Sequence, residues 1–330
     1  MRITTTTERL LVLVPAIGLL IVAVVAGISV GARTVPPGEV WRAFTDYAGT
    51  DDHLIVRDIR LPRTLTGLAI GAALGMAGAL VQTLTRNPLA EPGLLGVTAG
   101  AGFAINLGMV AGVAGTAAAR LGLALAGCAA AAVLVFAIGR TAPLRLVLAG
   151  VALSAVLSGL SLGMRLVWPD VLDGYRFWSV GALAGVEQTS RALPVIVLAV
   201  ALAGALLVAR PLGVMMLGDE AARALGAHVI RTRVAVLVIV TLLAGAATAV
   251  AGPIAFAGLM VPHLARRFAG GSVPWLAGFS LLFGPVLLVA ADVLARLLLP
   301  TGEVPVAIVT AFLGAPVLIW AVRRYGARSL

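Results

Sequence analysis

Long apolar runs separated by short polar connections fill almost all of this 330-residue chain. The clearest run is about 61–84, in which Thr66 is the only polar residue between Leu65 and Val81. A helix needs about 20 apolar residues to cross a bilayer, and a water-soluble helix of that length would show a polar face. The pattern therefore predicts membrane-spanning helices. We expect them at about 10–30, 61–84, 94–113, 121–138, 143–164, 192–209, 234–250, 253–265, 275–297 and 304–322.

The first run raises a question of processing. A secretory signal peptide has an apolar core of about 7–15 residues, and the run at 10–30 is longer than that. We therefore expect a retained first span.

The number of spans depends on the run 234–265, which Gly252-Pro253 interrupts. Hydropathy alone leaves open whether this run is one kinked span or two. Both chain ends are basic, as cytoplasmic segments are, and this requires an even number of spans. Counting two spans gives ten, with 253–265 too short to cross alone and half-buried in protein. We predict an all-α integral membrane protein of about ten transmembrane helices, forming one polytopic domain over 1–330.

A weak internal repeat fits this count. Shifting the chain by 174 residues superposes GAALGMAG (71–78) on GAATAVAG (245–252). With five spans between them, the two copies would run in opposite directions, and inverted repeats are typical of transporters. A chain rich in alanine and glycine also gives such matches by chance, so the repeat stays a hypothesis.

Composition supports the membrane class. Hydrophobic residues make up 61% of the chain, charged residues only 12%, and mean hydropathy is +1.08. The net charge of +10 does not indicate a nucleic-acid partner, because the arginines lie at span ends rather than in a stripe. Fourteen of the 24 basic residues fall in segments expected to be cytoplasmic, together with both termini: Arg2, Arg9, Arg86, Arg140, Arg145, Arg210, Arg223, Arg231, Arg233, Arg266, Arg267, Arg323, Arg324 and Arg328.

Several kinds of chemistry are missing from the sequence. All 24 basic residues are arginine, so the chain has no lysine for a phosphate-binding loop or a Schiff base. It is therefore not expected to hydrolyse ATP by itself. Cys128 is the only cysteine, and the three histidines lie far apart with no metal-ligand spacing. We predict no metal site.

Two stretches carry distinct local signals. The run 61–84 begins beside Arg60 and Arg63 and ends at Arg86-Asn87-Pro88, where proline stops the helix. Its glycines 67, 71 and 75 share one face at a spacing that allows close helix approach. The polar stretch 210–233 has acids after Gly218, a basic Arg223 and then Gly226, which indicates one short surface helix.

At this point a family resemblance emerges. The string RLPRTLTGLAIGAALGMAGALVQTLTRNPLAEPGLLGVTAGAG (60–102) resembles the membrane-spanning permease subunit of type II ABC importers for ferric siderophores, haem and cobalamin. So do LGDEAARALG (217–226), AGPIAFAGLMVPHLARR (251–267), and ADVLAR with LGAPVLIW (291–296, 313–320). The resemblance covers about 55–325, with the motifs in the family's order.

The resemblance implies partners and an energy source. Two permeases, as a homodimer or a heterodimer, would enclose a central pathway in the cell (inner) membrane. Two separate ATPase subunits would bind on the cytoplasmic side, and a solute-binding protein on the extracytoplasmic side. ATP and Mg would be bound by the ATPase, so this chain would hold no cofactor and would not itself be an enzyme. The cargo would be a ferric siderophore, with haem and cobalamin left open.

Residue roles follow from the same resemblance. The pathway would come from the second, fifth and tenth spans. The ATPase would couple to a segment at about 213–228, and the solute-binding protein would dock on arginines at the outer face. The coupling residues are Leu217, Gly218, Asp219, Glu220, Ala221, Leu225 and Gly226; the docking residues are Arg60, Arg63 and Arg296; the motif turn holds Asn87, Pro88, Glu91, Pro92 and Gly93.

Simpler interpretations stay open. The arginines would also suit anchoring in lipid headgroups, and the short helix would also suit a plain connection. Asp292 lies four residues before Arg296 on one helix, so we expect a local ion pair. A secondary transporter driven by an ion gradient is the alternative function. Such a transporter should have more acidic residues in the middle of its spans, and these are scarce here. A membrane enzyme would need clustered catalytic groups, and the sequence shows none.

Overall fold

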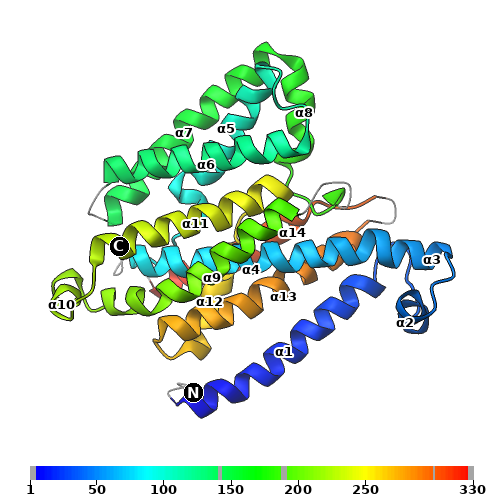
Figure 1. Ribbon diagram of the computed structural model, residues 1–330, viewed down its shortest axis with the longest axis horizontal. Coiled ribbons are helices and arrows are strands. Elements are labelled where there is room, and N and C mark those ends of the chain that lie inside the picture. The colour runs from blue at the N-terminus through cyan, green and yellow to red at the C-terminus, as the bar shows by residue number, and fades with distance from the viewer. Residues whose placement is uncertain (1–4, 140–142, 187–191, 300–301, 326–330) are drawn as a thin grey trace.

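A computed structural model of the chain describes residues 5–139, 143–186, 192–299 and 302–325. Within these ranges the regular elements are helices, and the longer ones lie side by side in a bundle (Figure 1). Their bounds are α1 (Thr6–Ser29), α2 (Pro37–Thr45), α3 (Asp51–Leu54), η1 (Ile55–Arg60), α4 (Leu61–Thr85), η2 (Pro92–Leu95), α5 (Val97–Val110), α6 (Ala117–Gly139), α7 (Pro143–Val167), α8 (Pro169–Ser179), α9 (Ala192–Met215), α10 (Asp219–Ala224), α11 (Val229–Ala251), α12 (Ala257–Ala269), α13 (Val273–Leu297) and α14 (Val306–Tyr325).

The predicted all-α membrane fold is confirmed. Seven helices in the described part of the chain are long and apolar enough to cross a membrane, and α5 and most of α14 are shorter apolar helices. Helix α12 has 13 residues and is largely buried, as expected for the short segment after Gly252-Pro253. Each of the ten predicted segments corresponds to one helix.

Several boundaries differ from the prediction; α9 runs on to Met215 rather than ending near 209, and α11 begins at Val229 rather than near 234. The segment expected to form a span at 94–113 is helical only over Val97–Val110, because Pro92–Leu95 forms a separate 3-10 turn. The polar connection 31–59, for which no helix was predicted, contains α2, α3 and most of the π-helical η1, which runs on into α4. Pro36 and Pro37 start α2, and the Thr50 side chain caps α3.

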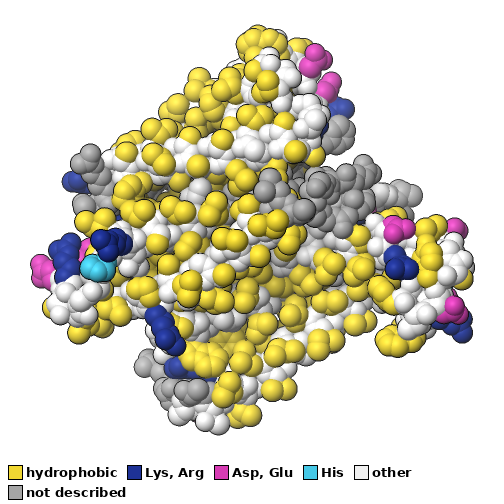
Figure 2. Space-filling model, in the orientation of Figure 1, with side chains coloured by type: hydrophobic (Ala, Val, Ile, Leu, Met, Phe, Trp, Pro, Cys, Tyr) yellow, Lys and Arg dark blue, Asp and Glu magenta, His cyan; other side chains and the backbone are white. Residues whose placement is uncertain are grey.

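In Figure 1 the first turn of α1 lies towards the left of the bundle, the end at which α10 protrudes. We call this the α10 end, and the opposite end, with α2 and α3, the α3 end. Helices α4 and α11, which the proposed repeat superposes, run in opposite directions (Figure 1). Figure 2 shows apolar side chains over the middle of the visible face and charged side chains gathered towards its edges, an arrangement suited to a bilayer.

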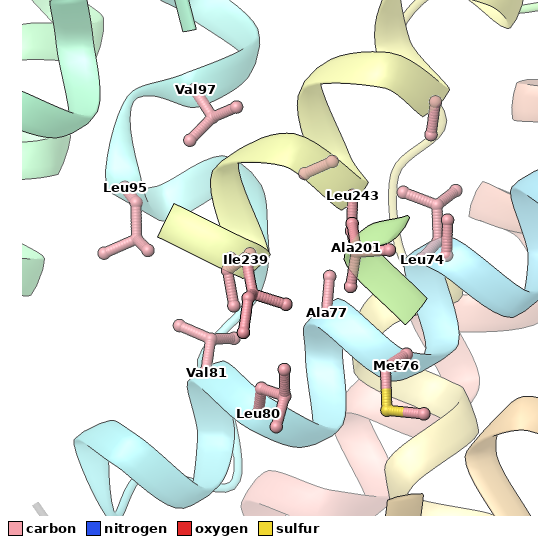
Figure 3. Packing of buried hydrophobic residues seen from close by; sticks show 14 of the residues in the cluster. Leu74, Met76, Ala77, Leu80, Val81, Leu95, Val97, Ala201, Ile239 and Leu243 are labelled. Atoms are coloured by element: carbon pink, nitrogen blue, oxygen red, sulfur yellow. The ribbon is translucent and has the colours of Figure 1, made fainter. Parts of the chain in front are cut away.

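Helix α4 is the centre of the core. It is surrounded by α9, α11, α12 and α13, and Figure 3 shows its residues Leu74, Ala77 and Val81 among side chains of η2, α5, α9 and α11. Its glycines allow this packing: a Cβ atom at Gly71 would lie 2.5 Å from the carbonyl oxygen of Gly284 in α13.

This burial bears on the expected pathway, which stays a prediction. The second span was expected to line the pathway, but 78% of the apolar window of α4 is buried inside its own chain. The fifth span, α7, has only 22% of its window buried and keeps a large exposed face. The structure therefore does not support a lining role for most of α4.

Candidate functional site

Two charged clusters lie at opposite ends of α4, and the first surrounds Asp292 at the α3 end. Arg63 donates from Nε and Nη2 to the Asp292 carboxylate, at 2.7–3.1 Å, and from Nη1 to Glu303 at 2.6 Å. Arg296 Nη2 lies 3.1 Å from Asp292 Oδ2, so the expected local ion pair is confirmed. The side chains of Arg63, Asp292 and Arg296 are each at most 7% exposed. The cluster thus joins α4, α13 and the segment before α14.

Arginines of this cluster also hold the end of α1. Arg296 Nη1 donates to the carbonyl oxygens of Gly27 and Val30, at 3.0 Å each, and Arg60 Nη1 donates to that of Ser29 at 2.7 Å. Arg60 Nη2 donates to the carbonyl oxygen of Arg33. The last carbonyls of a helix have no partner within the helix and carry partial negative charge, which arginine satisfies.

The three predicted docking arginines are therefore buried in contacts within the chain. The structure brings Arg63 and Arg296 together around one carboxylate and places Arg60 beside them, against the end of α1. Their role in docking stays a prediction. Sequence reasoning missed Glu303 and the α1 carbonyls as their partners, because these partners lie between 31 and 269 positions away and no local spacing links them.

The motif turn follows α4 at the α10 end. Arg86 has a positive φ of 53°, a left-handed conformation that ends the helix, and Asn87 Oδ1 accepts from the Leu89 amide at 2.8 Å. The chain then turns back into the bundle. Pro92 lies against Gly258 of α12, at the level of Leu74 near the middle of α4. The expected tight turn between two spans is therefore a re-entrant segment.

Glu91 fastens this segment to α12. Its carboxylate accepts a hydrogen bond from the Phe256 amide at 2.7 Å, at the first turn of α12. Phe256 has a φ of 66°, an uncommon conformation for a bulky residue. Glu91, Pro92 and Gly93 line a cavity of about 180 Å³ with Thr98 and Thr248. Glu91 thus supplies an acceptor that the start of a helix lacks.

The predicted coupling segment is a short capped helix, α10, as its sequence indicated. Gly218 precedes it with a φ of 105°, and Gly226 follows it with a φ of 80°. Leu217 and Leu225 are 66% and 67% exposed, and Glu220 and Ala221 are exposed as well. Asp219 opens the helix and Ala222 is its buried residue. The segment presents an apolar and acidic surface at the α10 end.

The second cluster ties α10 to the bundle. The Asp219 carboxylate lies 3.3 Å from Arg86 Nη2 and 3.0 Å from Arg233 Nη2 of α11. Arg86 also donates to the Met215 carbonyl oxygen at 2.7 Å. Sequence reasoning placed all three charged residues on one side of the membrane but did not pair them.

The described residues include histidine, cysteine and acidic side chains, which are possible metal ligands. They contain no group of three or more His, Cys, Asp or Glu side chains that would hold a metal ion. Cys128 is buried, and its thiol donates to the Val97 carbonyl oxygen. Among the described residues, the two ends of α4 carry the ion pairs of Asp292 and of Asp219.

Comparisons with known proteins agree with this arrangement. Residues 19–324 match the FecCD transport family. The ferric enterobactin transport system permease protein FepD of Escherichia coli (strain K12) is 48% identical over 93% of both chains. The hemin transport system permease protein HmuU of Yersinia pestis is 36% identical over 93% of both chains. The vitamin B12 import system permease protein BtuC of Klebsiella pneumoniae is 35% identical over 94% of this chain and 93% of its own.

A solved structure has the same fold. It is a chain of a metal-chelate type ABC transporter in an inward-facing conformation, with a TM-score of 0.81 and 26% identity. The match covers 96% of this chain and 99% of the other.

Proposed function

This chain belongs to the FecCD transport family, and we propose that it is the permease subunit of an ATP-driven importer for a ferric siderophore. The observation that carries the proposal is the 48% identity, over 93% of both chains, to a ferric enterobactin permease. Permeases for hemin and vitamin B12 are only 36% and 35% identical. A siderophore is therefore the favoured cargo, with haem and cobalamin as its competitors.

The proposed assembly has two permeases, two ATPase subunits and one solute-binding protein. The ATPases bind at the α10 end, where Leu217 and Leu225 are exposed, and they hold the ATP and Mg. That end is cytoplasmic, together with both termini, in the inner membrane. The arginine bias of the expected cytoplasmic segments supports this orientation. The chain itself supplies the pathway and no ATPase site.

The solute-binding protein docks at the α3 end in this proposal. Arg60, Arg63 and Arg296 supply positive charge there, and acids of the binding protein would compete with Asp292 and Glu303 for it. Glu303 is the accessible competitor, because its side chain is 36% exposed and that of Asp292 only 2%.

The substrate is tested by uptake in cells. A host that lacks its own siderophore, haem and cobalamin permeases would receive this chain with its ATPase and binding protein. We expect uptake of radiolabelled iron from a ferric siderophore, at a rate far above that of labelled haem or cobalamin. Uptake of haem or cobalamin alone would overturn the assignment of a ferric siderophore as the substrate, but it would leave the assignment to the importers unchanged.

A further inference from the structure

The ion pairs of Asp219 connect α10 to the next helix, α11, and to the end of α4, which lies 133 residues earlier in the chain. One carboxylate oxygen faces Arg86, directly after α4, and the other faces Arg233, in the first turns of α11. Arg86 also holds the Met215 carbonyl oxygen at the end of α9. Asp219 is itself the first residue of α10. A single side chain therefore joins α10 to the ends of the bundle helices.

Little else holds α10 in place. Ala222 is its one buried residue among those described, and Leu225 beside it is 67% exposed. A cavity of about 160 Å³ lies next to the cluster, lined by Thr83, Leu212 and Met215 with the three charged residues. Elements with few buried apolar contacts are free to move as units. Gly218 and Gly226, both at positive φ, flank α10 where hinges would lie.

The helices joined to α10 lead away from this end. Helix α4 has no proline in its interior and runs to Arg63 at the opposite cluster, about 35 Å away at 1.5 Å per residue. Helix α11 leads to the break at Gly252, where α12 begins beyond an irregular stretch. A shift of α10 would thus be passed to the cluster around Asp292 at the α3 end and to the break between α11 and α12.

We infer that Arg86 and Arg233 are positioning residues that, through Asp219, transmit the movement of α10 to α4 and α11 during transport. This rests on the proposed function, in which an ATPase moves α10. The two pairs are unequal. Arg86 and Asp219 are 44% and 32% exposed, and ion pairs of that exposure stabilise little. The Arg233 side chain is 8% exposed, so its charge depends more strongly on Asp219.

The test uses Arg233→Gln in the complete importer, with permease, ATPase and binding protein in proteoliposomes. ATP hydrolysis and substrate uptake are measured in the same vesicles. We expect substrate transported per ATP to fall about tenfold, within the usual range of coupling between sites, while ATPase remains bound. Arg231→Gln is the matched control, because Arg231 is an exposed arginine two residues away on α11. The amount of substrate that Arg231→Gln transports per ATP should equal that of the wild type.

Two further variants separate transmission from folding. Arg233→Lys keeps the charge and should restore part of the ratio. Asp219→Asn added to Arg233→Gln should cost little more than the single change, because the Asp219–Arg233 pair is already lost and the Asp219–Arg86 pair, which it also removes, is exposed and stabilises little. An unchanged ratio in Arg233→Gln overturns the inference. Loss of the ATPase from the complex also overturns it, since the cluster would then serve assembly.

Hydrogen exchange on the permease alone distinguishes this inference from the proposed function. Amides of α10 should exchange about tenfold faster in Arg233→Gln than in Arg231→Gln, because local opening becomes easier. Equal exchange rates in the two variants would show that the Asp219–Arg233 pair does not hold α10, whatever partner binds there, and would overturn the inference. A wild-type permease that binds no ATPase would contradict the proposed function instead, and the exchange result would still decide whether Asp219 holds α10.

Discussion

Asp292 forms ion pairs with Arg63 of α4 and Arg296 of α13, and Glu303 forms an ion pair with Nη1 of Arg63. Removing one partner from such a buried set leaves an uncompensated charge, which costs about 3–5 kcal/mol. Asp292 is therefore needed for folding whether or not the cluster docks a partner. Glu303 is different, because its side chain is partly exposed at the α3 end.

Glu303→Gln tests docking without emptying the buried cluster. If a binding-protein acid uses Arg63, neutralising its competitor should strengthen binding about two- to fivefold, the effect of one partly exposed ion pair. The measurement is the dissociation constant of the binding protein for the permease in nanodiscs.

The control for that prediction is Asp58→Asn, which removes one exposed negative charge from η1 near the same end. Affinity that rises equally in both variants would show a general effect of charge. Affinity that stays unchanged in Glu303→Gln would contradict a docking role for Arg63.

Sequence reasoning reached some of these residues and not others. The Asp292–Arg296 pair follows from a four-residue spacing on one helix, and the structure has it. The partners of Arg63 lie 229 and 240 residues away, so only the fold brings them together. Sequence reasoning placed Asp219 at the start of a short surface helix but paired it with no arginine, because Arg86 lies 133 residues away in the chain.

At the scale of elements, glycine decides how closely α4 packs. A Cβ atom at Gly78 would clash with the carbonyl oxygen of Gly258 in α12, and backbone cannot move aside as a flexible side chain would. Gly78→Ala should therefore lower the free energy of unfolding by about 1–3 kcal/mol, the cost of overpacking. Thermal unfolding in detergent would measure it.

Gly122→Ala is the matched substitution for this test. Gly122 lies in α6 with open space around its Cβ position, so alanine should leave stability unchanged or raise it slightly. A Gly78→Ala variant as stable as the wild type would contradict the close approach of α4 and α12.

Hydropathy located the helices because each long span has to be apolar along most of its length. It could not foresee the re-entrant segment after Arg86, where Pro92 reaches the level of Leu74. That segment depends on Gly258 in the first turn of α12 and on the hydrogen bond from Phe256, the residue before α12, to Glu91; both lie at least 165 residues after Glu91 in the chain. Helices α2 and α3 were missed because they are short and polar.

For the whole molecule, α4 connects two clusters with different tasks. At the α3 end the arginines hold α1, α4 and α13 together, and at the α10 end Asp219 holds an otherwise exposed helix. A central buried helix that ends in both places suits a permease that couples an inner partner to an outer one. The fold and family support this arrangement, and the partners themselves are proposals.

The most direct test of the central claim is ATP-driven uptake by the isolated complex. The tagged chain would be purified gently from its host's membranes and reconstituted with its binding protein and a ferric siderophore. We predict that an ATPase subunit co-purifies in equal amount, and that uptake requires ATP and is blocked by vanadate. Uptake that proceeds without any ATPase and follows an ion gradient would contradict the account and make the chain a secondary transporter.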